Sequence, residues 1–179
     1  MKKINNLKIL GIDPGLAVTG YGIINQEENS LSYIASGTIK TSSKDKGFSE
    51  RLKIILDGLN EVIETFQPNC VSIEKVFVNL NPQSTLLLGQ ARGAALSICV
   101  INKLSIYEYT ALQIKKSVVG NGHADKFQVQ SMVQKILNLP SPASEDSSDA
   151  LAAAICHAHS FNYMSKILGS NRVKGGRLL

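Results

Sequence analysis

The sequence predicts an α/β fold in which a five-stranded mixed sheet is flanked by helices on both faces. Two observations support this prediction. Three strand-like segments open the chain, and helical and strand-like segments alternate after them. An antiparallel meander followed by strand–helix alternation gives a sheet with both strand directions and helices on each side. The 179 residues suffice for one domain, because a chain of this length buries roughly two-thirds of its unfolded surface.

The three opening strands are separated by short turns. Lys8–Asp13 is short and apolar, Thr19–Asn25 is rich in β-branched and aromatic residues, and Leu31–Lys40 alternates between apolar and polar positions. The turns at Asp13-Pro14-Gly15 and at 26–30 are short enough to join neighbouring antiparallel strands. We therefore expect these segments to form a three-stranded meander.

The rest of the chain alternates between helices and strands. Apolar residues at steps of three and four predict a helix over Phe48–Phe66, which Gln67-Pro68-Asn69 ends. The later segments, in chain order, are a buried strand at Val71–Glu74, a helix at Pro82–Ile101, a strand at Ser105–Tyr109, helices at Leu112–Val119 and Lys126–Leu137, and an alanine-rich helix from Asp146 to about Met164. This order of elements is the one expected of a ribonuclease H-like fold.

The ends of the chain and its cysteines indicate the broad class. We expect residues 1–168 to form a single domain and residues 169–179, which hold three glycines and three basic residues, to form a flexible basic tail. The three cysteines lie in apolar stretches without C-x-x-C spacing, which indicates reduced, buried thiols: Cys70, Cys99 and Cys156. The chain shows no signal peptide and no apolar run of membrane-spanning length, so we expect a cytoplasmic protein.

Four acidic residues occupy positions from which they can meet. Asp13 and Glu74 each end an apolar strand, and Asp146 and Asp149 are three apart, so they share one face of a helix. If the first and fourth strands are neighbours, the last helix can bring its two acids to the strand ends. Carboxylates packed together repel one another, and Mg²⁺ or Mn²⁺ would balance them. Two such ions roughly 3.5–4 Å apart would support hydrolysis of a phosphodiester.

Three of the four acids also have a plain structural explanation. Asp13 precedes Pro14-Gly15 and suits a turn, Glu74 suits a solvated strand end, and Asp146 suits the positive end of a helix. The four positions taken together favour the metal site. Glu145 directly precedes Asp146 and competes with it for a cation, and either Asp146 or Asp149 could be the direct ligand.

Several residues are candidates for contact with a polyanion, which the net charge of +5 permits. Lys115, Lys116 and Lys126 flank the turn at Gly120–Gly122, where they would neutralise phosphates or simply form a solvated face. Phe77 follows Glu74 into a polar loop, where it would stack on bases or cap the core. The histidines suit a zinc site poorly, since His157 and His159 are two apart on a helix and point in different directions, whereas His123 is a candidate phosphate contact.

The chain resembles the bacterial RuvC Holliday junction resolvases from about Ile9 to His159. Five segments in order carry this resemblance: Gly11-Ile12-Asp13-Pro14-Gly15 with Thr19-Gly20-Tyr21-Gly22, Ile73-Glu74-Lys75-Val76-Phe77, Leu88-Gly89-Gln90-Ala91-Arg92-Gly93, Lys115 through Val118-Val119-Gly120 to Lys126, and Asp146-Ser147-Ser148-Asp149-Ala150-Leu151-Ala152. Each segment alone is weak, but the five together at compatible spacings are specific.

The resemblance implies a ribonuclease H-like nuclease whose metal-binding and catalytic carboxylates are Asp13, Glu74, Asp146 and Asp149. It implies a requirement for Mg²⁺, with two ions per site and Mn²⁺ as a substitute. It also implies a homodimer that resolves four-way junction DNA by symmetric nicks in strands of like polarity, at thymine-containing sites and together with the RuvA–RuvB branch-migration complex. By the same resemblance, the residues matching Lys115 and Lys126 contact DNA, and the residue matching Phe77 acts at the junction centre.

Three rival functions stay open at this point. Asp13, Gly15 and Gly20 are spaced as in the phosphate loop of actin-like ATPases and sugar kinases, but those proteins usually need two such domains. Another ribonuclease H-like nuclease, acting on RNA, is expected to lack Phe77 and the Asp146/Asp149 pair. A module that binds branched DNA without cutting it is disfavoured, because four acids beside a phosphate would weaken binding unless metal ions lie between them.

Overall fold

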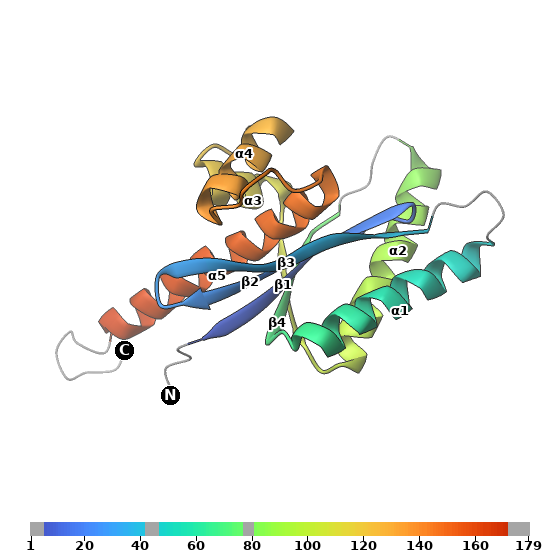
Figure 1. The fold of residues 1–179 in the computed structure, drawn as a ribbon, viewed down its shortest axis with the longest axis horizontal. Coiled ribbons are helices and arrows are strands. Elements are labelled where there is room, and N and C mark those ends of the chain that lie inside the picture. Colours follow the sequence, from blue (N-terminus) through green and yellow to red (C-terminus); the bar gives the residue numbers. More distant parts are fainter. Residues whose placement is uncertain (1–5, 42–46, 77–80, 172–179) are drawn as a thin grey trace.

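The computed structural model describes residues 6–41, 47–76 and 81–171, with side chains to residue 161. Its strands form one five-stranded sheet in the order β3-β2-β1-β4-β5, and Figure 1 shows helices on both faces. β1, β2 and β3 are antiparallel, whereas β4 and β5 run parallel to β1. The strands are β1 Leu7–Asp13, β2 Val18–Glu27, β3 Ser30–Lys40, β4 Cys70–Glu74 and β5 Ser105–Tyr109. The predicted mixed sheet, with its opening meander, is confirmed.

The helices divide between the two faces of the sheet. One apolar cluster joins α1 and α2 to residues such as Leu10, Ile12 and Ile73, and the other joins α3, α4 and α5 to residues such as Ile9 and Ile24. Adjacent residues of β1 belong to different clusters because side chains alternate across a strand. The helices are α1 Phe48–Phe66, α2 Pro82–Ile101, α3 Ala111–Val119, α4 Lys126–Ile136 and α5 Glu145–Asn171.

The helix α5 lies directly on the sheet, with α3 and α4 packed on its outer side (Figure 1). Every residue from Ala150 to Ala158 is buried, as expected of a helix that is covered on all sides. Glycines in the strands permit this close approach: a Cβ on Gly11 would overlap the carbonyl oxygen of Ala150, and one on Gly22 would lie 2.6 Å from Cγ of Leu151. The sheet and the helix therefore meet almost backbone to backbone.

The helix α2 corrects one expectation. Among the described residues it is the single helix long and apolar enough to cross a membrane by length and composition, whereas the sequence analysis expected no such segment. An 18-residue stretch of this helix has a mean hydropathy of 1.4, and the helix holds only one charged residue, Arg92. In the structure it packs small and medium apolar residues, including Ala91, Ala95 and Cys99, against the sheet. Leu86 and Ile101 stay exposed on its outer side.

The last helix is longer than the sequence predicted. α5 runs from Glu145 to Asn171, so it passes Met164 and enters the predicted tail by three residues, 169–171. Alanines at 150, 152, 153, 154 and 158 favour a continuous helix. Residues 172–179 of the predicted tail, and Phe77 with residues 78–80, lie outside the described residues.

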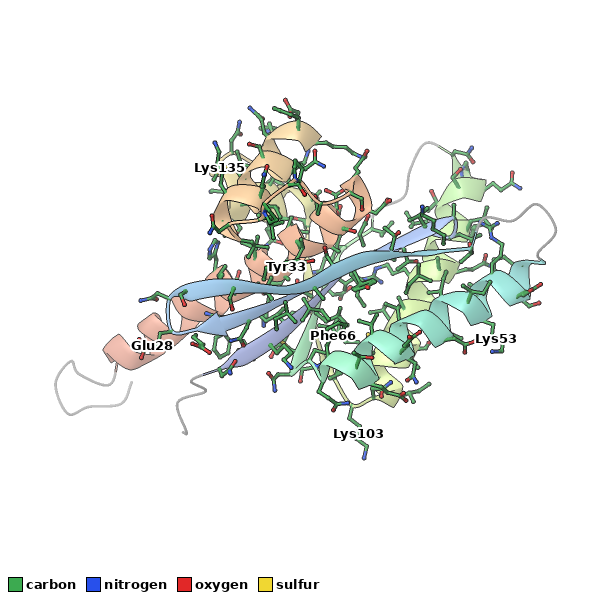
Figure 2. The ribbon with its side chains drawn as sticks, viewed as in Figure 1. Glu28, Tyr33, Lys53, Phe66, Lys103 and Lys135 are labelled. Carbon is green, nitrogen blue, oxygen red and sulfur yellow. The ribbon has the colours of Figure 1, made fainter. Side chains whose placement is uncertain are left out.

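The three cysteines are buried, whereas several lysines lie on the surface. Cys70, Cys99 and Cys156 are free and buried, as predicted, and burial raises the pKa of the first two thiols to about 12 and of the third to about 11. Figure 2 shows Lys53, Lys103 and Lys135 pointing outward on different sides of the molecule. The excess positive charge is therefore not confined to one face.

Candidate active site

Asp13 and Glu74 lie side by side at one end of the sheet. They are the last residues of β1 and β4, two parallel strands whose registered pairs run up to Ile12 beside Ile73. Two residues earlier, Gly11 faces α5, and the Ser72 hydroxyl donates a hydrogen bond to the Ala153 carbonyl of α5 (2.6 Å). Because strand side chains repeat every two residues, both carboxylates point to the α5 side.

The start of α5 brings Asp146 to the same place. Asp13 pairs with Gly20 of β2, and a Cβ on Gly20 would overlap the backbone of Asp146. The missing side chain at Gly20 therefore lets the first turn of α5 rest beside Asp13. Asp149, one turn further along, shares this face of the helix. Ser144 holds the helix start, since its carbonyl accepts from the Ser148 N–H at 2.8 Å.

The electrostatics show how closely the four acids interact. Burial, followed by repulsion from Asp149, Glu74 and Asp146, raises the pKa of Asp13 to about 7. Burial also raises the pKa of Glu74, with Asp149 as the next cause, and burial raises the pKa of Asp149. Two carboxylates at the strand ends and two on α5 thus form one mutually repelling cluster. Sequence reasoning anticipated this convergence from strand ends and helix spacing alone.

A hard divalent cation fits this donor set. The side chains offer only oxygen, and their repulsion is what a cation would relieve. Within the described residues, no group of three or more His, Cys, Asp or Glu is arranged to hold a metal ion as it stands. Mg²⁺ usually takes one or two protein carboxylates and completes its shell with water and substrate phosphates. The pairs of carboxylates that could bind such a cation include Asp13 with Glu74 and Asp13 with Asp149.

Two of the three candidate lysines act on this cluster. Lys126, the first residue of α4, lowers the pKa of Asp13 and Asp149, and Lys115 of α3 lowers the pKa of Glu74 and Asp149. Lys116 is exposed and is not among the groups that shift the pKa of the described carboxylates Asp13, Glu74 and Asp149. The structure therefore brings Lys115 and Lys126 to the acids and leaves Lys116 on the outer surface of α3.

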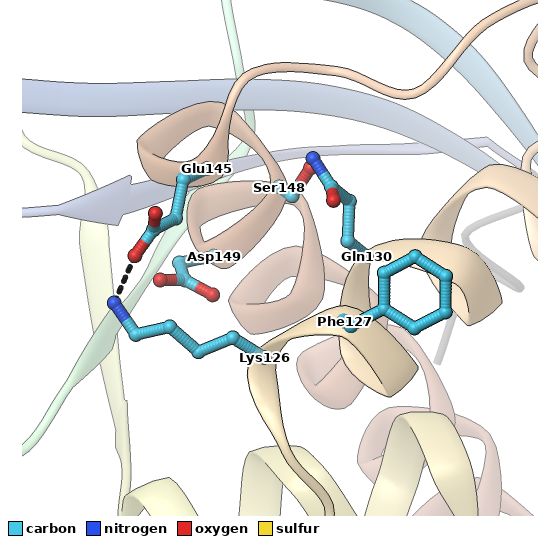
Figure 3. Close-up of a pocket in the computed structure, with 6 residues that line it drawn as sticks. All are labelled: Lys126, Phe127, Gln130, Glu145, Ser148 and Asp149. Carbon is cyan, nitrogen blue, oxygen red and sulfur yellow. Dashed lines mark hydrogen bonds and ion pairs between the residues drawn. The ribbon is translucent and has the colours of Figure 1, made fainter.

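Glu145 lies opposite Lys126. The two side chains form an exposed ion pair across a hollow that Asp149 also lines (Figure 3). The hydrogen bond to Glu145 is the largest cause that raises the pKa of Lys126. Glu145, which the sequence marked as a competitor of Asp146, is thus engaged by a lysine.

Sequence reasoning missed the residues that hold the site in place. Arg92 of α2 donates to the Glu74 carbonyl at 3.3 Å and pairs with Glu108. Arg51 of α1 donates to the Leu16 carbonyl at 3.1 Å, which fixes the loop that follows Asp13. Gly20 lets the first turn of α5 lie close to β2. Gly20 and Arg92 lie within the segments that carry the family resemblance, so the sequence marked them as family residues. Their roles could not be predicted, because the residues that they contact lie far away in sequence.

The histidines form no shared site. His157 is buried, stacks on Tyr107 with ring centroids 4.1 Å apart, and its Nδ1 lies 2.8 Å from the Tyr109 hydroxyl. His159 is exposed beside Ser117. His123 lies in the loop before α4.

Comparison with known proteins gives consistent matches over nearly the whole chain. A family model described as crossover junction endodeoxyribonuclease RuvC matches residues 9–157. The protein of that name from Methylobacillus flagellatus is 59% identical in an alignment of 177 positions that covers 96% of this chain and 98% of the relative. The one from Nitrosomonas eutropha is 55% identical over 171 residues, which are 96% of this chain and 95% of the relative.

Solved structures agree with the sequence matches. A structure titled T. thermophilus RuvC in complex with Holliday junction substrate superposes with a TM-score of 0.82 at 29% identity, covering 89% of this chain and 97% of the other. The yeast mitochondrial Holliday junction resolvase Ydc2 has a TM-score of 0.64 at 12% identity over 92% of this chain and 81% of the other, which shows a likeness of fold.

Proposed function

The chain belongs to the RuvC family of crossover junction endodeoxyribonucleases, and from this premise we propose that Asp13, Glu74, Asp146 and Asp149 form the centre that cuts its DNA. As a member of this family the chain is a metal-dependent nuclease with a ribonuclease H-like fold. Its substrate is the four-way Holliday junction, which it resolves by hydrolysing phosphodiester bonds, in homologous recombination and DNA repair. The rival kinase, RNA nuclease and non-cleaving interpretations are set aside on this ground.

One observation carries the assignment of the centre. Two acids at neighbouring strand ends and two on the first turns of α5 form a cluster in which burial, followed by repulsion among the acids, raises the pKa of Asp13 to about 7. A fold has no structural reason to gather repelling carboxylates, and groups with such shifts cluster at functional sites. Asp149 is the first of the acids that raise the pKa of Asp13, so we favour it over Asp146 as the direct ligand from α5.

The cofactor that we propose is Mg²⁺, two ions per centre, with Mn²⁺ as a substitute. Asp13, Glu74, Asp146 and Asp149 would hold these ions, which would supply activation of the attacking water and stabilisation of the leaving 3′ oxygen. The chain itself contributes orientation. Arg92 fixes the backbone at Glu74, and Gly20 keeps the Asp146 turn against Asp13, so the acids stay in place as charge accumulates.

The lysines give the centre its attraction for DNA. We propose that Lys115 and Lys126 neutralise phosphates on either side of the scissile bond, since both already lower the pKa of the acids. Lys126 would exchange Glu145 for a phosphate when DNA arrives, and Lys116 would contact the strand further out. Phe77, outside the described residues, is proposed to act at the junction centre.

The assembly that we propose is a homodimer. A junction with two-fold symmetry is cut symmetrically, in two strands of like polarity, by a two-fold protein with paired centres. α2 leaves Leu86 and Ile101 exposed, which supplies apolar surface for a second copy. We further propose that the protein acts in the cytoplasm, where bacterial DNA lies, together with the RuvA–RuvB complex.

A cleavage assay tests the proposed centre. The purified protein is incubated with a synthetic four-way junction and Mg²⁺, with linear duplex and chelator as substrate and cofactor controls. Asp13→Asn is expected to cut at least about a hundredfold more slowly, as when one group of a catalytic electrostatic assembly is lost. The matched control is Asp57→Asn, an exposed acid on α1 that pairs with Lys53, and it should cut normally.

Three results would contradict the proposal in different ways. Unchanged cleavage by Asp13→Asn would remove this acid from the centre. Junction binding without any cleavage in Mg²⁺ or Mn²⁺ would support a binding module instead. Equal cutting of linear duplex would refute the substrate assignment.

A further inference from the structure

We propose that Phe127 is a DNA-contact residue that stacks on a nucleotide next to the scissile phosphate. This inference rests on the proposed function and extends it to a residue beyond the acids and lysines. Phe127 is the most exposed large hydrophobic side chain among the described residues, with 77% of its surface accessible. A single exposed apolar side chain needs no explanation by itself, so the inference depends on where this ring stands.

The ring has no role in holding the fold. α4 packs on the core through Val129 and Val133, which are buried, and neither apolar cluster includes Phe127. Because so little of the ring is covered, its burial adds little to stability. Phenylalanine is also a weaker helix former than alanine, so the start of α4 does not require it.

Its position ties the ring to the candidate active site. Phe127 lines the same hollow as Lys126, Glu145 and Asp149, and Asp149 belongs to the acid cluster. Figure 3 shows Lys126 and Phe127 leaving the start of α4 on opposite sides, the lysine toward Glu145 and the ring away from it. A strand whose phosphate meets Lys126 and Asp149 would therefore present a neighbouring sugar or base to Phe127.

The remaining lining of the hollow suits a nucleotide. Gln130, one turn after Phe127, has its amide held by the Ala143 carbonyl at 2.7 Å, and Ser148 completes the wall. An apolar ring beside fixed polar groups and a lysine matches the mixed surface of a nucleotide, which has a flat face, polar edges and a charged phosphate. Aromatic side chains in single-strand sites stack on bases in this way without requiring one particular base.

The test compares variants of the full-length protein on one four-way junction. Phe127→Ala removes the ring, Phe127→Leu keeps an apolar side chain without a flat face, and Phe127→Tyr keeps the flat face. Phe48→Ala is the matched control, because Phe48 is a 41% exposed phenylalanine at the start of α1, on the opposite side of the sheet. Thermal unfolding of each variant verifies that the fold is intact.

Binding in chelator and cleavage in Mg²⁺ are both measured. Phe127→Ala is expected to weaken junction binding by about five- to a hundredfold, the range for loss of one stacking contact. Phe127→Tyr should restore most of the loss, Phe127→Leu only part of it, and Phe48→Ala should behave as the unaltered protein.

An abasic scan then locates the contact. Each nucleotide near the cut is replaced in turn by an abasic residue, which removes the base and keeps the phosphate. At one position the unaltered protein should lose binding as strongly as Phe127→Ala does, while Phe127→Ala should lose nothing more there, because the two changes delete the same contact.

The outcomes separate this inference from the proposed function. If the unaltered protein and Phe48→Ala cut the junction, Asp13→Asn does not, and Phe127→Ala binds within twofold of the unaltered protein, the stacking inference alone is overturned. It is also overturned if the abasic losses add to the Phe127→Ala loss at every position, or if Phe127→Ala changes only the oligomeric state. If the unaltered protein neither binds nor cuts the junction, both the proposed function and the inference are overturned.

Discussion

The two faces of the sheet are covered in different ways. On one face, α5 rests on glycines and is buried on all sides beneath α3 and α4. On the other face, α1 packs through large side chains such as Ile55 and Leu59, and α2 leaves much of its apolar surface exposed. The glycines of α2 also differ from those of β1 and β2, since a Cβ on Gly89 or Gly93 would meet nothing within 4 Å.

This difference explains where the acids gather. Large side chains keep a helix at the usual 8–10 Å from its neighbour, whereas glycines and alanines allow the backbones to approach more closely. Among the described residues, acidic side chains of a helix reach the ends of two strands on the face that α5 covers. The face with the tightest backbone packing therefore carries the candidate active site, and the looser face supports it through Arg92 and Arg51.

The largest expected effect comes from adding one carbon to the face of the sheet that α5 covers. Gly11→Ala places a Cβ onto the Ala150 carbonyl, and backbone on both sides cannot yield without shifting α5. We expect a loss of at least about 4 kcal/mol in the free energy of unfolding, and a loss of cleavage, since overpacking against backbone exceeds ordinary core strain. Urea unfolding measures this loss. A variant as stable as the unaltered protein would show that α5 is not held as tightly as the structure indicates.

The acid cluster itself should destabilise the fold when no cation balances it. The pKa of Asp13 rises from 3.8 to about 7 on folding, so the folded state binds this proton more tightly and its stability falls as pH rises from about 4 to about 7. In chelator at pH 8, Asp13→Asn should be more stable by up to roughly 4 kcal/mol.

Denaturation curves across this pH range measure the effect, with Asp57→Asn as the control. Mg²⁺ should raise the melting temperature of the unaltered protein more than that of Asp13→Asn, because a ligand of the folded state stabilises by mass action. Equal melting temperatures of the unaltered protein and Asp13→Asn in chelator would mean that burial and the neighbouring acids do not penalise the Asp13 carboxylate.

His157, in the middle of α5, should produce a pH dependence of opposite sign. Burial lowers its pKa from 6.5 to about 4, so the unfolded state binds the proton more tightly, and stability is lost as pH falls from about 6.5 through 4. The loss should total roughly 3 kcal/mol. His157→Gln should flatten this part of the curve, whereas His159→Gln, an exposed neighbour, should leave it unchanged. An unaltered slope in His157→Gln would assign the acid sensitivity to other groups.

The smallest expected effect comes from a substitution in α2, on the face of the sheet that α1 and α2 cover. Gly93→Ala adds a Cβ into space that is open in the single chain and removes a helix-weakening glycine from α2, so it should stabilise the monomer by about 1 kcal/mol. Thermal unfolding at a protein concentration low enough to keep the chain monomeric measures this gain. A loss of monomer stability would contradict the prediction, whereas a loss confined to high protein concentration would place Gly93 in the interface of the proposed homodimer.

Local periodicity predicted much of the fold. The helices α1 and α2 have the bounds expected from the sequence, because one has strong amphipathic spacing and the other has Pro82 in its first turn and Asn81 as its cap. The end of α5 was predicted too early, since nothing in its alanine-rich sequence marks a stop near Met164. The ribonuclease H-like fold class is confirmed, because the order of strands and helices leaves few ways to build one sheet.

The sequence by itself determined which side chains were available to the candidate site: acids at two strand ends, a pair of acids one turn apart, and lysines around a turn. These features follow from short-range spacing, which can be read directly from the sequence. Only the tertiary structure decided that Asp146 rests on Gly20, that Lys126 pairs with Glu145, and that Phe127 stands exposed beside them. Such contacts join residues far apart in sequence, so they exist only once packing has chosen which surfaces meet.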